Sequence, residues 1–333
     1  MDQVARFEAA DRAALFTQTA ATLNISPIVV EKDFWVTWTL AHLYALQGVP
    51  RLLFKGGTSL SKCYGLIERF SEDLDLGLHR DDLGIAKGDV PTLHKGTKQR
   101  SRDLDQIAQR AQDYVRDTLT PKLREEFGSV LRDKFDLKVE LSQKESVVMF
   151  GYPVALSAGL YGGGRYVGPI VKLEIGARAD HYPTRERDVR SLAAEAFPKA
   201  FAMTSARVVA QAPERTLLEK ALLLHSNARR GKVGERSSRH AYDLLMLLRA
   251  GAMDDVTRQL YLEVAEHKGI FGEDRHASEA PTKGICIVGD EEVMRRLQAD
   301  YRAMDEMFYT RPPAFGEVAD ALRAIEGRIN GLC

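Results

Sequence analysis

The chain has 333 residues, 44% of them hydrophobic, which is enough to bury a full core and to form two domains. Its formal net charge is zero at pH 7, so overall charge does not indicate a nucleic-acid-binding protein. No run of about 18 apolar residues is present, and the N-terminus MDQVARFEAADRAALF lacks the basic-then-apolar order of a signal peptide. We therefore expect neither membrane insertion nor export, and a cytoplasmic location.

The three cysteines, Cys63, Cys286 and Cys333, lie far apart in the sequence and form no C-x-x-C pair. An odd count without paired spacing argues against a disulfide framework and against a structural zinc site. We expect three free thiols.

The first predicted helix begins at Ser26-Pro27, where an N-cap residue precedes a proline at the first helical position. The segment PIVVEKDFWVTWTLAHLYAL continues without a breaker as far as Gly48, so we predict a helix over residues 27–46. Residues 51–54 are apolar and are followed by two glycines, which indicates a strand running into a tight turn.

The stretch KGGTSLSKCYG places two glycines ahead of two hydroxyl residues. Gly56 and Gly57 predict the turn, and Thr58 or Ser59 can cap a helix that ends near Gly65. Glycines allow close backbone approach, and the amides of a turn leading into a helix attract anions, so this turn is a candidate phosphate site. The motif G-x-x-x-x-G-K-[ST] is absent, which argues against a P-loop ATPase.

An acidic strand is predicted next. Residues 73–78 alternate with a period of two, which places Asp73 and Asp75 on one face and leucines on the other. Two neighbouring carboxylates repel one another unless a cation lies between them, and oxygen ligands of this kind suit Mg²⁺. Because Mg²⁺ usually keeps part of its shell for substrate phosphates, the acids and the glycine turn favour one shared site.

Taken singly, these signals are weak. A G-G-T turn is common, and a lone D-x-D is more often a solvated strand or turn than a metal site, whereas the two in this order favour phosphoryl transfer. A two-metal site would use a third carboxylate from a neighbouring strand, and Glu174 in VKLEI is the candidate. The alternative for Glu174 is a cross-strand ion pair on an exposed strand face.

The rest of the chain is first β-rich and then helical. Residues from about 95 to 134 are rich in charge and helix formers, and LYGGGRYVG, residues 160–168, predicts a turn. From Pro213 the pattern is helical, beginning with PERTLLEKALLLHSNA and SRHAYDLLMLLRAG. The strands predicted in this part are 135–141, 145–156, 168–177 and 206–212.

We therefore predict an α+β protein with two domains. The first, residues 1–212, holds a mixed sheet with flanking helices, including the N-terminal helices. The second, residues 213–333, is a helical C-terminal domain.

Basic residues outnumber acidic ones between Arg207 and His240. A local basic surface is one interpretation, but from the residues alone a solvated helix pair with a charged connector is the favoured one. The candidate nucleic-acid-binding residues are Arg207, Arg229, Arg230, Lys232, Arg236 and Arg239.

Four blocks, VVEKDFWVTW, KGGTSLSKCYGLIERFSEDLDL, PERTLLEKALLLH and SRHAYDLL, run from residue 29 to about residue 248. Together they closely resemble the AbiEii/AbiGii nucleotidyltransferase toxins, a family that includes the mycobacterial MenT toxins. The resemblance implies a DNA polymerase β-like nucleotidyltransferase fold. Thr58 stands where serine is usual, and its spacing to Asp73 is longer than in most of that superfamily.

The resemblance also implies roles for single residues. Asp73 and Asp75 would be catalytic and would hold Mg²⁺, or Mn²⁺ in its place, with Glu174 as a further metal ligand, and Lys220 and Asp243 would be catalytic too. From the residues alone, spacing favours a Lys220 that snorkels from the edge of the core and an Asp243 that forms an intrahelical ion pair with Arg239, and only the resemblance favours the catalytic roles. The nucleotide-binding residues would be Gly56, Gly57, Thr58, Ser59, Lys62 and Lys220.

For the reaction, the resemblance implies transfer of a nucleoside monophosphate from an NTP to the 3′ end of tRNA, which would block aminoacylation and translation. It also implies a separate antitoxin, either an AbiEi-like winged-helix protein or a kinase-like protein. A protein or small-molecule hydroxyl as acceptor, and a catalytically inactive binding protein, remain as alternatives. The sequence does not identify the NTP, the tRNA, the number of nucleotides added, the oligomeric state, or whether an antitoxin modifies Ser71 or Thr58.

Overall fold

The computed structural model describes residues 1–69, 71, 73–142, 145–161, 168–308 and 311–333. The chain divides into two compact units: unit 1 comprises Met1–Cys63, Ser71–Ala86 and Asp105–Ala210, and unit 2 comprises Tyr64–Phe70, Lys87–Leu104 and Gln211–Cys333. The division at 210/211 lies close to the predicted border after residue 212. The segments 64–70 and 87–104, which the prediction assigned to the first domain, group with the C-terminal helices.

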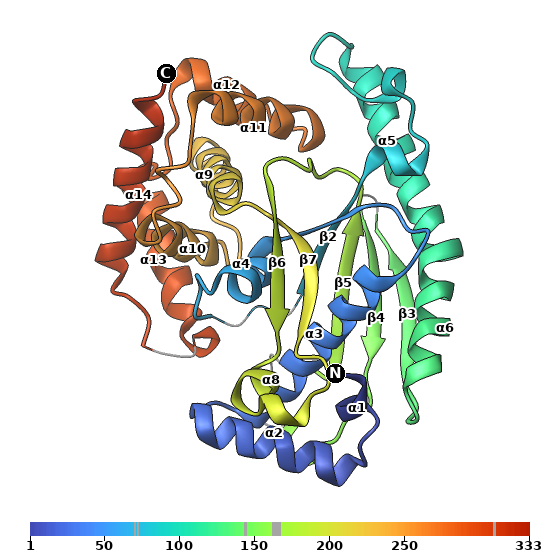
Figure 1. The fold of residues 1–333 in the computed structure, drawn as a ribbon. Coiled ribbons are helices and arrows are strands. Elements are labelled where there is room, and N and C mark those ends of the chain that lie inside the picture. Colours follow the sequence, from blue (N-terminus) through green and yellow to red (C-terminus); the bar gives the residue numbers. More distant parts are fainter. Residues whose placement is uncertain (70, 72, 143–144, 162–167, 309–310) are drawn as a thin grey trace. The chain divides into compact units, whose positions relative to one another are not determined.

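A seven-stranded mixed sheet forms the centre of unit 1, with the strand order β3-β4-β5-β2-β1-β7-β6 (Figure 1). Strand β2 runs antiparallel to β1 and parallel to β5, and β5 runs antiparallel to β4. The predicted mixed sheet with flanking helices is therefore confirmed. The strands are β1 (Leu52–Lys55), β2 (Asp73–Leu78), β3 (Asp136–Leu141), β4 (Ser146–Gly151), β5 (Ile170–Gly176), β6 (Thr184–Arg190) and β7 (Ser205–Gln211).

An aromatic core covers one face of this sheet. Trp35 and Trp38 project from α3 (Pro27–Ala45) and Phe127 from α6 (Thr120–Val130), and their rings lie 4.8 to 6.0 Å from the ring of Phe150 on β4. The leucines of β2, and Val171, Leu173 and Ile175 of β5, are buried. Because the period of two sends the intervening residues to the opposite face, the polar residues of β2 and β5 lie away from this core.

Helices account for most of the remaining chain. Those preceding residue 211 are α1 (Asp2–Ala5), α2 (Ala9–Leu23), α3, α4 (Gly56–Tyr64), α5 (Thr97–Tyr114), a π-helical turn (Val115–Leu119), α6, α7 (Ala158–Tyr161) and α8 (Leu192–Ala196). Unit 2 continues with α9 (Pro213–Arg229), α10 (Ser238–Arg249), α11 (Arg258–Phe271), α12 (Arg275–Lys283), α13 (Glu291–Ala303) and α14 (Phe315–Asn330). The predicted helical C-terminal region is confirmed.

The structure differs from the sequence-based expectation at three places, and a fourth prediction is not tested. Helix α4 begins at Gly56 itself, so the two glycines form its first turn rather than a turn before it. Strand β4 ends at Gly151, short of the predicted residue 156, because Pro153 has no backbone N–H to donate to a ladder. Strand β6 was not predicted. The Gly-rich turn predicted at 160–168 falls largely on residues 162–167, which lie outside the described residues.

The three cysteines are free thiols. Within the described part of the chain, no single helix has the length and apolar character needed to cross a membrane, and only the pair α2 and α3, bent by 113°, meets that test jointly.

Candidate active site

Three carboxylates and a lysine lie on neighbouring strands of unit 1. Asp75 on β2 is paired in register with Lys55 on β1 at one side and with Glu174 on β5 at the other. Residues directly opposite one another in a sheet project from the same face, and Asp73, two residues before Asp75, shares that face. The strand register therefore brings the three predicted acids to one face of the sheet.

These acids also influence one another electrostatically. The pKa of Glu174 is raised to about 7, first because burial disfavours its charged form and then because Asp75 and Asp73 are negatively charged neighbours. A positive charge is also near, since Lys55 Nζ lies 3.9 Å from Asp75 Oδ1. Three acids beside one lysine make this face of the sheet a favourable place for a cation.

Gly56 lets the start of α4 lie directly against Asp75. Its φ is +78°, in the left-handed region, and a Cβ at this position would lie only 1.8 Å from Asp75 Oδ2. No other residue type fits here without moving the carboxylate or the helix. The first amides of a helix lack intrahelical partners and attract anions, so the structure places an anion-favouring helix start next to a cation-favouring carboxylate.

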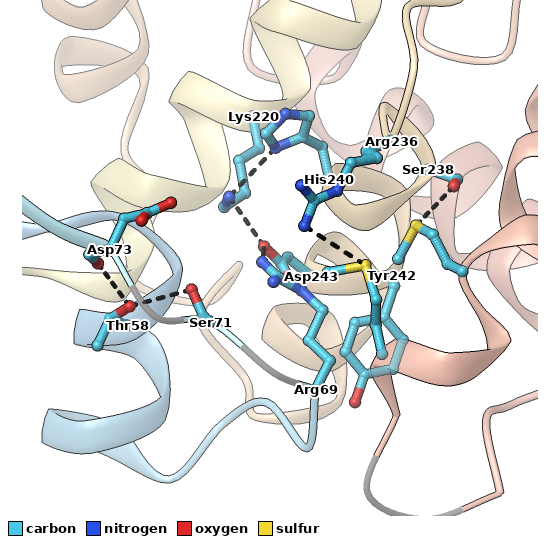
Figure 2. Close-up of polar contacts among 12 residues, drawn as sticks. Thr58, Arg69, Ser71, Asp73, Lys220, Arg236, Ser238, His240, Tyr242 and Asp243 are labelled. Atoms are coloured by element: carbon cyan, nitrogen blue, oxygen red, sulfur yellow. Dashed lines mark hydrogen bonds and ion pairs between the residues drawn. The ribbon is translucent and has the colours of Figure 1, made fainter. Parts of the chain in front are cut away.

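The hydroxyl residues of α4 make contacts within the protein. Thr58 is 2% exposed, and its hydroxyl lies 2.7 Å from the carbonyl oxygen of Asp73 and 3.0 Å from Ser71 Oγ (Figure 2). Ser59 is equally buried and its side chain hydrogen-bonds to Cys63, whose pKa burial raises to about 12. These contacts tie α4 to the acidic strand, while the predicted phosphate contacts of Thr58 and Ser59 remain predictions.

Lys62, another predicted phosphate-binding residue on α4, is engaged elsewhere. Its ammonium pairs with the carboxylate of Asp33 on α3 and donates a hydrogen bond of 2.9 Å to the carbonyl oxygen of Arg190. The side chain is 11% exposed. The structure therefore gives Lys62 protein partners, and contact with a nucleotide stays a prediction for this residue.

Asp73 and Asp75 fit a divalent cation. Asp73 Oδ1 is buried and has no hydrogen-bond partner among the described residues. A carboxylate oxygen accepts but does not donate, and burying it unpaired is unfavourable, so a bound cation would explain this oxygen. No three His, Cys, Asp or Glu side chains in the described ranges are close enough to hold one metal between them. In proteins, one or two carboxylates hold Mg²⁺ together with waters and substrate phosphates.

A second charged cluster lies in unit 2 around Asp243 on α10 (Figure 2). The carboxylate of Asp243 is fully buried and accepts two hydrogen bonds of 2.7 Å from Arg69. It also forms an ion pair of 2.9 Å with Lys220 on α9. Burial alone would raise the pKa of Asp243, but the two cations outweigh it and hold the pKa well below its usual range. Asp243 is therefore ionised and orients both cations, which is the alternative to an intrahelical pair with Arg239.

His240 completes this cluster. Its Nδ1 lies 3.3 Å from Lys220 Nζ, and burial followed by the charge of Lys220 lowers its pKa well below the usual value. A neutral imidazole accepts a hydrogen bond from the ammonium, so two of the three donors of Lys220 are directed toward α10. The third donor can serve another acceptor.

The predicted basic residues divide between the two units. Arg207 lies on β7 in unit 1, where it pairs with Glu186. The others belong to the end of α9, the connection to α10 and the start of α10, and four of these five are exposed: Arg229, Arg230, Lys232 and Arg236. We refer to these four residues as the basic connector.

Sequence reasoning missed three residues of these clusters. Arg69, His240 and Lys55 carry no motif of their own. Arg69 does lie four residues before Asp73 in the quoted acidic stretch, and Lys55 immediately precedes the glycines, so proximity in sequence to the candidate motif is the signal that was present.

Comparison with known families identifies the class of protein. The family model "Nucleotidyl transferase AbiEii toxin, Type IV TA system" matches residues 38–323, most of the chain. The chain therefore belongs to the AbiEii family of nucleotidyltransferase toxins from type IV toxin–antitoxin systems.

Among solved structures, the chain is similar to MenT4, the nucleotidyltransferase toxin Rv2826c from Mycobacterium tuberculosis H37Rv. The two are 16% identical, the match covers 96% of this chain and 98% of that chain, and the TM-score is 0.44. A search of the curated proteins gives no match.

Proposed function

We propose that this toxin transfers a nucleoside monophosphate from an NTP to the 3′ hydroxyl of tRNA, with Mg²⁺ or Mn²⁺ as cofactor, and so blocks aminoacylation and translation. The observation that carries the proposal is the arrangement in unit 1, where Asp73 and Asp75 share one sheet face with Glu174 and the start of α4 lies against Asp75. The family supplies the reaction class, nucleotidyl transfer.

The acids of unit 1 would hold the metal and organise the reacting groups. The cation would lower the pKa of the attacking hydroxyl and neutralise charge on the phosphates. Asp73 and Asp75 supply its carboxylate oxygens, and Glu174, with a pKa raised to about 7, completes the acceptor side of the site. The acceptor hydroxyl releases its proton to water and its oxygen bonds to the α-phosphorus. The bond from the α-phosphorus to the bridging oxygen breaks, and pyrophosphate leaves with the electron pair.

In unit 1, the start of α4 would bind phosphate oxygens of the nucleotide. The first amides of α4, at Gly56 and Gly57, favour anionic oxygens, with Thr58 and Ser59 next to them. In unit 2, the family resemblance gives Lys220 the role of a nucleotide-binding residue, and Asp243 orients its ammonium through the ion pair of 2.9 Å.

Transfer RNA is the acceptor that the basic connector favours. Its four exposed cations lie within eight residues, 229 to 236, of unit 2, and backbone phosphates attract such groups without regard to base sequence. The same reasoning assigns weaker roles to Arg207 and Arg230, which pair with Glu186 and Asp274, and to Arg239, which is half-buried. A cytoplasmic location follows from tRNA as the substrate.

An antitoxin is the expected protein partner, since the family belongs to toxin–antitoxin systems. We propose an AbiEi-like winged-helix protein or a kinase-like protein in this role. Ser71 and Thr58, which contact one another beside Asp73, are the hydroxyls whose modification would reach the acidic strand.

Labelling with each α-³²P-NTP tests the proposal. The full chain is incubated with Mg²⁺, one labelled NTP at a time, and separate pools of total tRNA and total protein. We expect label in tRNA with at least one NTP and none with Asp73→Asn. Label in the protein pool alone would contradict the choice of acceptor, and no label in either pool with any NTP would contradict nucleotidyl transfer.

A further inference from the structure

Helix α3 carries three consecutive charged residues in the otherwise apolar block VVEKDFWVTW, and the chemistry above gives them no role. Glu31 is fully buried, Lys32 is 4% exposed, and the side chain of Asp33 is 12% exposed. Burying a charge is unfavourable unless it is paired, and replacing a buried ion pair by apolar residues often stabilises a protein. A specific task is therefore a better explanation than stability for three such residues in a row.

Glu31 and Lys32 hold segments of unit 1 that precede β5. Glu31 accepts hydrogen bonds of 2.6 Å from the amide of Ala155 and from the hydroxyl of Tyr161. Lys32 donates a hydrogen bond of 3.2 Å to the carbonyl oxygen of Gly168. These partners all belong to the connection between β4 and β5.

Asp33 connects α3 to the glycine-led helix α4. One carboxylate oxygen pairs with Lys62 on α4, and the other accepts a hydrogen bond of 2.7 Å from the amide of Leu192 at the start of α8. Lys62 in turn donates to the carbonyl oxygen of Arg190, at the end of β6. The two side chains and these two backbone groups form one network, in which Asp33 and Lys62 each have two partners.

Helix α4 is thus held at two places one helical turn apart. Near its start, Thr58 is bonded to the backbone of the acidic strand at Asp73, and Gly56 abuts Asp75. One turn later, Lys62 is bonded to Asp33 and to the end of β6. An isolated helix of nine residues would be marginal in water, so these contacts determine where its first turn lies.

We propose that Asp33 is a positioning residue for phosphate binding, acting through Lys62 to hold the first turn of α4 against the metal-binding acids. In this role Lys62 acts on the triphosphate through the placement of Gly56 and Gly57 instead of by direct contact. The inference rests on the proposed nucleotidyl transfer, and it adds the block around Asp33 to the binding site.

A double-mutant cycle tests whether Asp33 and Lys62 act on nucleotide binding through one contact, and the α4 exchange experiment below tests whether that contact positions the helix. The variants are Asp33→Asn, Lys62→Met and the two together, and the KM for the NTP and the kcat are measured at saturating tRNA. We expect each single variant to raise the KM about tenfold, within the range typical of coupling through one contact, with kcat changed less than about threefold. The increase in KM for the NTP in the double variant is expected to be no greater than the larger of the two single increases, because both changes break one network.

Hydrogen exchange of the α4 amides gives a readout that does not depend on activity. Exchange over residues 56–64 should be faster in both single variants than in the wild type. Asp133→Asn is the matched control, since it removes the partner of another buried cation, Arg12, and should leave both the KM for the NTP and α4 exchange unchanged.

A wild-type KM for the NTP with Asp33→Asn would overturn the inference. Single effects on this KM that multiply in the double variant would also overturn it, because they would show that Asp33 and Lys62 act independently. If the wild type transfers no nucleotide to any acceptor, the proposed function fails, and α4 exchange at the wild-type rate in Asp33→Asn would then overturn the positioning role separately.

Discussion

Replacing Gly56 by alanine should disable the enzyme while costing little more stability than a matched control. The left-handed backbone at this position strains an alanine by about 1 to 2 kcal/mol. In addition, the new methyl group would lie 1.8 Å from Asp75 Oδ2, whereas real Cβ contacts stay beyond 3.0 Å. The carboxylate or the start of α4 must therefore move by more than about 1 Å, and a misplacement of that size can lower a rate by about 10²-fold.

Gly65 provides the control, because it has the same backbone strain without the clash. Its φ is +63°, and a Cβ there would meet no atom within 4 Å. Gly56→Ala and Gly65→Ala should thus both lower the urea midpoint slightly. The initial rate of labelled NMP transfer, measured at saturating NTP and tRNA, should fall about 100-fold in the first variant and less than about threefold in the second. Equal rates in the two variants would refute the close approach of α4 to Asp75 as a requirement for transfer.

Three further predictions concern other parts of the chain. Asp243→Asn leaves two buried cations facing a neutral amide. It should therefore lower the free energy of unfolding by about 3 to 5 kcal/mol in urea titrations, and it should also abolish transfer. A decrease in this free energy below about 1 kcal/mol would contradict the pairing of Asp243 with Arg69 and Lys220. Removing two charges of the basic connector with Arg229→Gln and Lys232→Gln should raise the KM for tRNA and leave the KM for NTP unchanged. The slope of log binding constant against log salt concentration should become shallower by about one for each phosphate that is no longer neutralised. An unchanged salt slope would argue against this surface as the tRNA-binding site. Burial, and then neighbouring charges, lower the pKa of His181 to about 4, so the folded protein favours the neutral ring. The stability that this histidine contributes above about pH 6.5 should therefore be lost as the pH falls toward 4. The urea midpoint of His181→Phe should drop less between pH 7 and pH 5 than that of the wild type, and an identical drop would contradict the assignment.

The elements that local chemistry determines were predictable from sequence. Ser26-Pro27 marks the first residue of α3, and the strict alternation over 73–78 gives β2 with its bounds. Gly65, with its positive φ, follows the end of α4 as predicted. In each case a residue preference acts within one or two turns of the chain, and tertiary packing does not oppose it.

Other elements depended on distant partners. Strand β6 has the sequence TRERDVR, without an apolar period, because it lies at the edge of the sheet and needs only one paired neighbour. Gly56 was expected in a turn before the helix, whereas contact with Asp75 places it in the first helical turn. Neither outcome follows from residue preferences alone.

The candidate site shows the same division. The shared face of Asp73 and Asp75 follows from their spacing, but their proximity to Glu174 depends on β5 pairing beside β2 in parallel. Arg69 and Asp243 are 174 positions apart in the chain, and no spacing rule connects them. Sequence patterns thus identified Asp73 and Asp75 as candidates, whereas only the structure shows that Arg69 and Lys220 keep Asp243 ionised.

Metal binding at Asp73 and Asp75 is the central claim, and Mn²⁺ titration followed by electron paramagnetic resonance tests it most directly. The wild type should bind at least one Mn²⁺ per chain, more tightly when a non-hydrolysable NTP is present, and Asp73→Asn/Asp75→Asn should lose this binding while keeping a wild-type circular dichroism spectrum. Undiminished Mn²⁺ binding in the folded double variant would contradict the account.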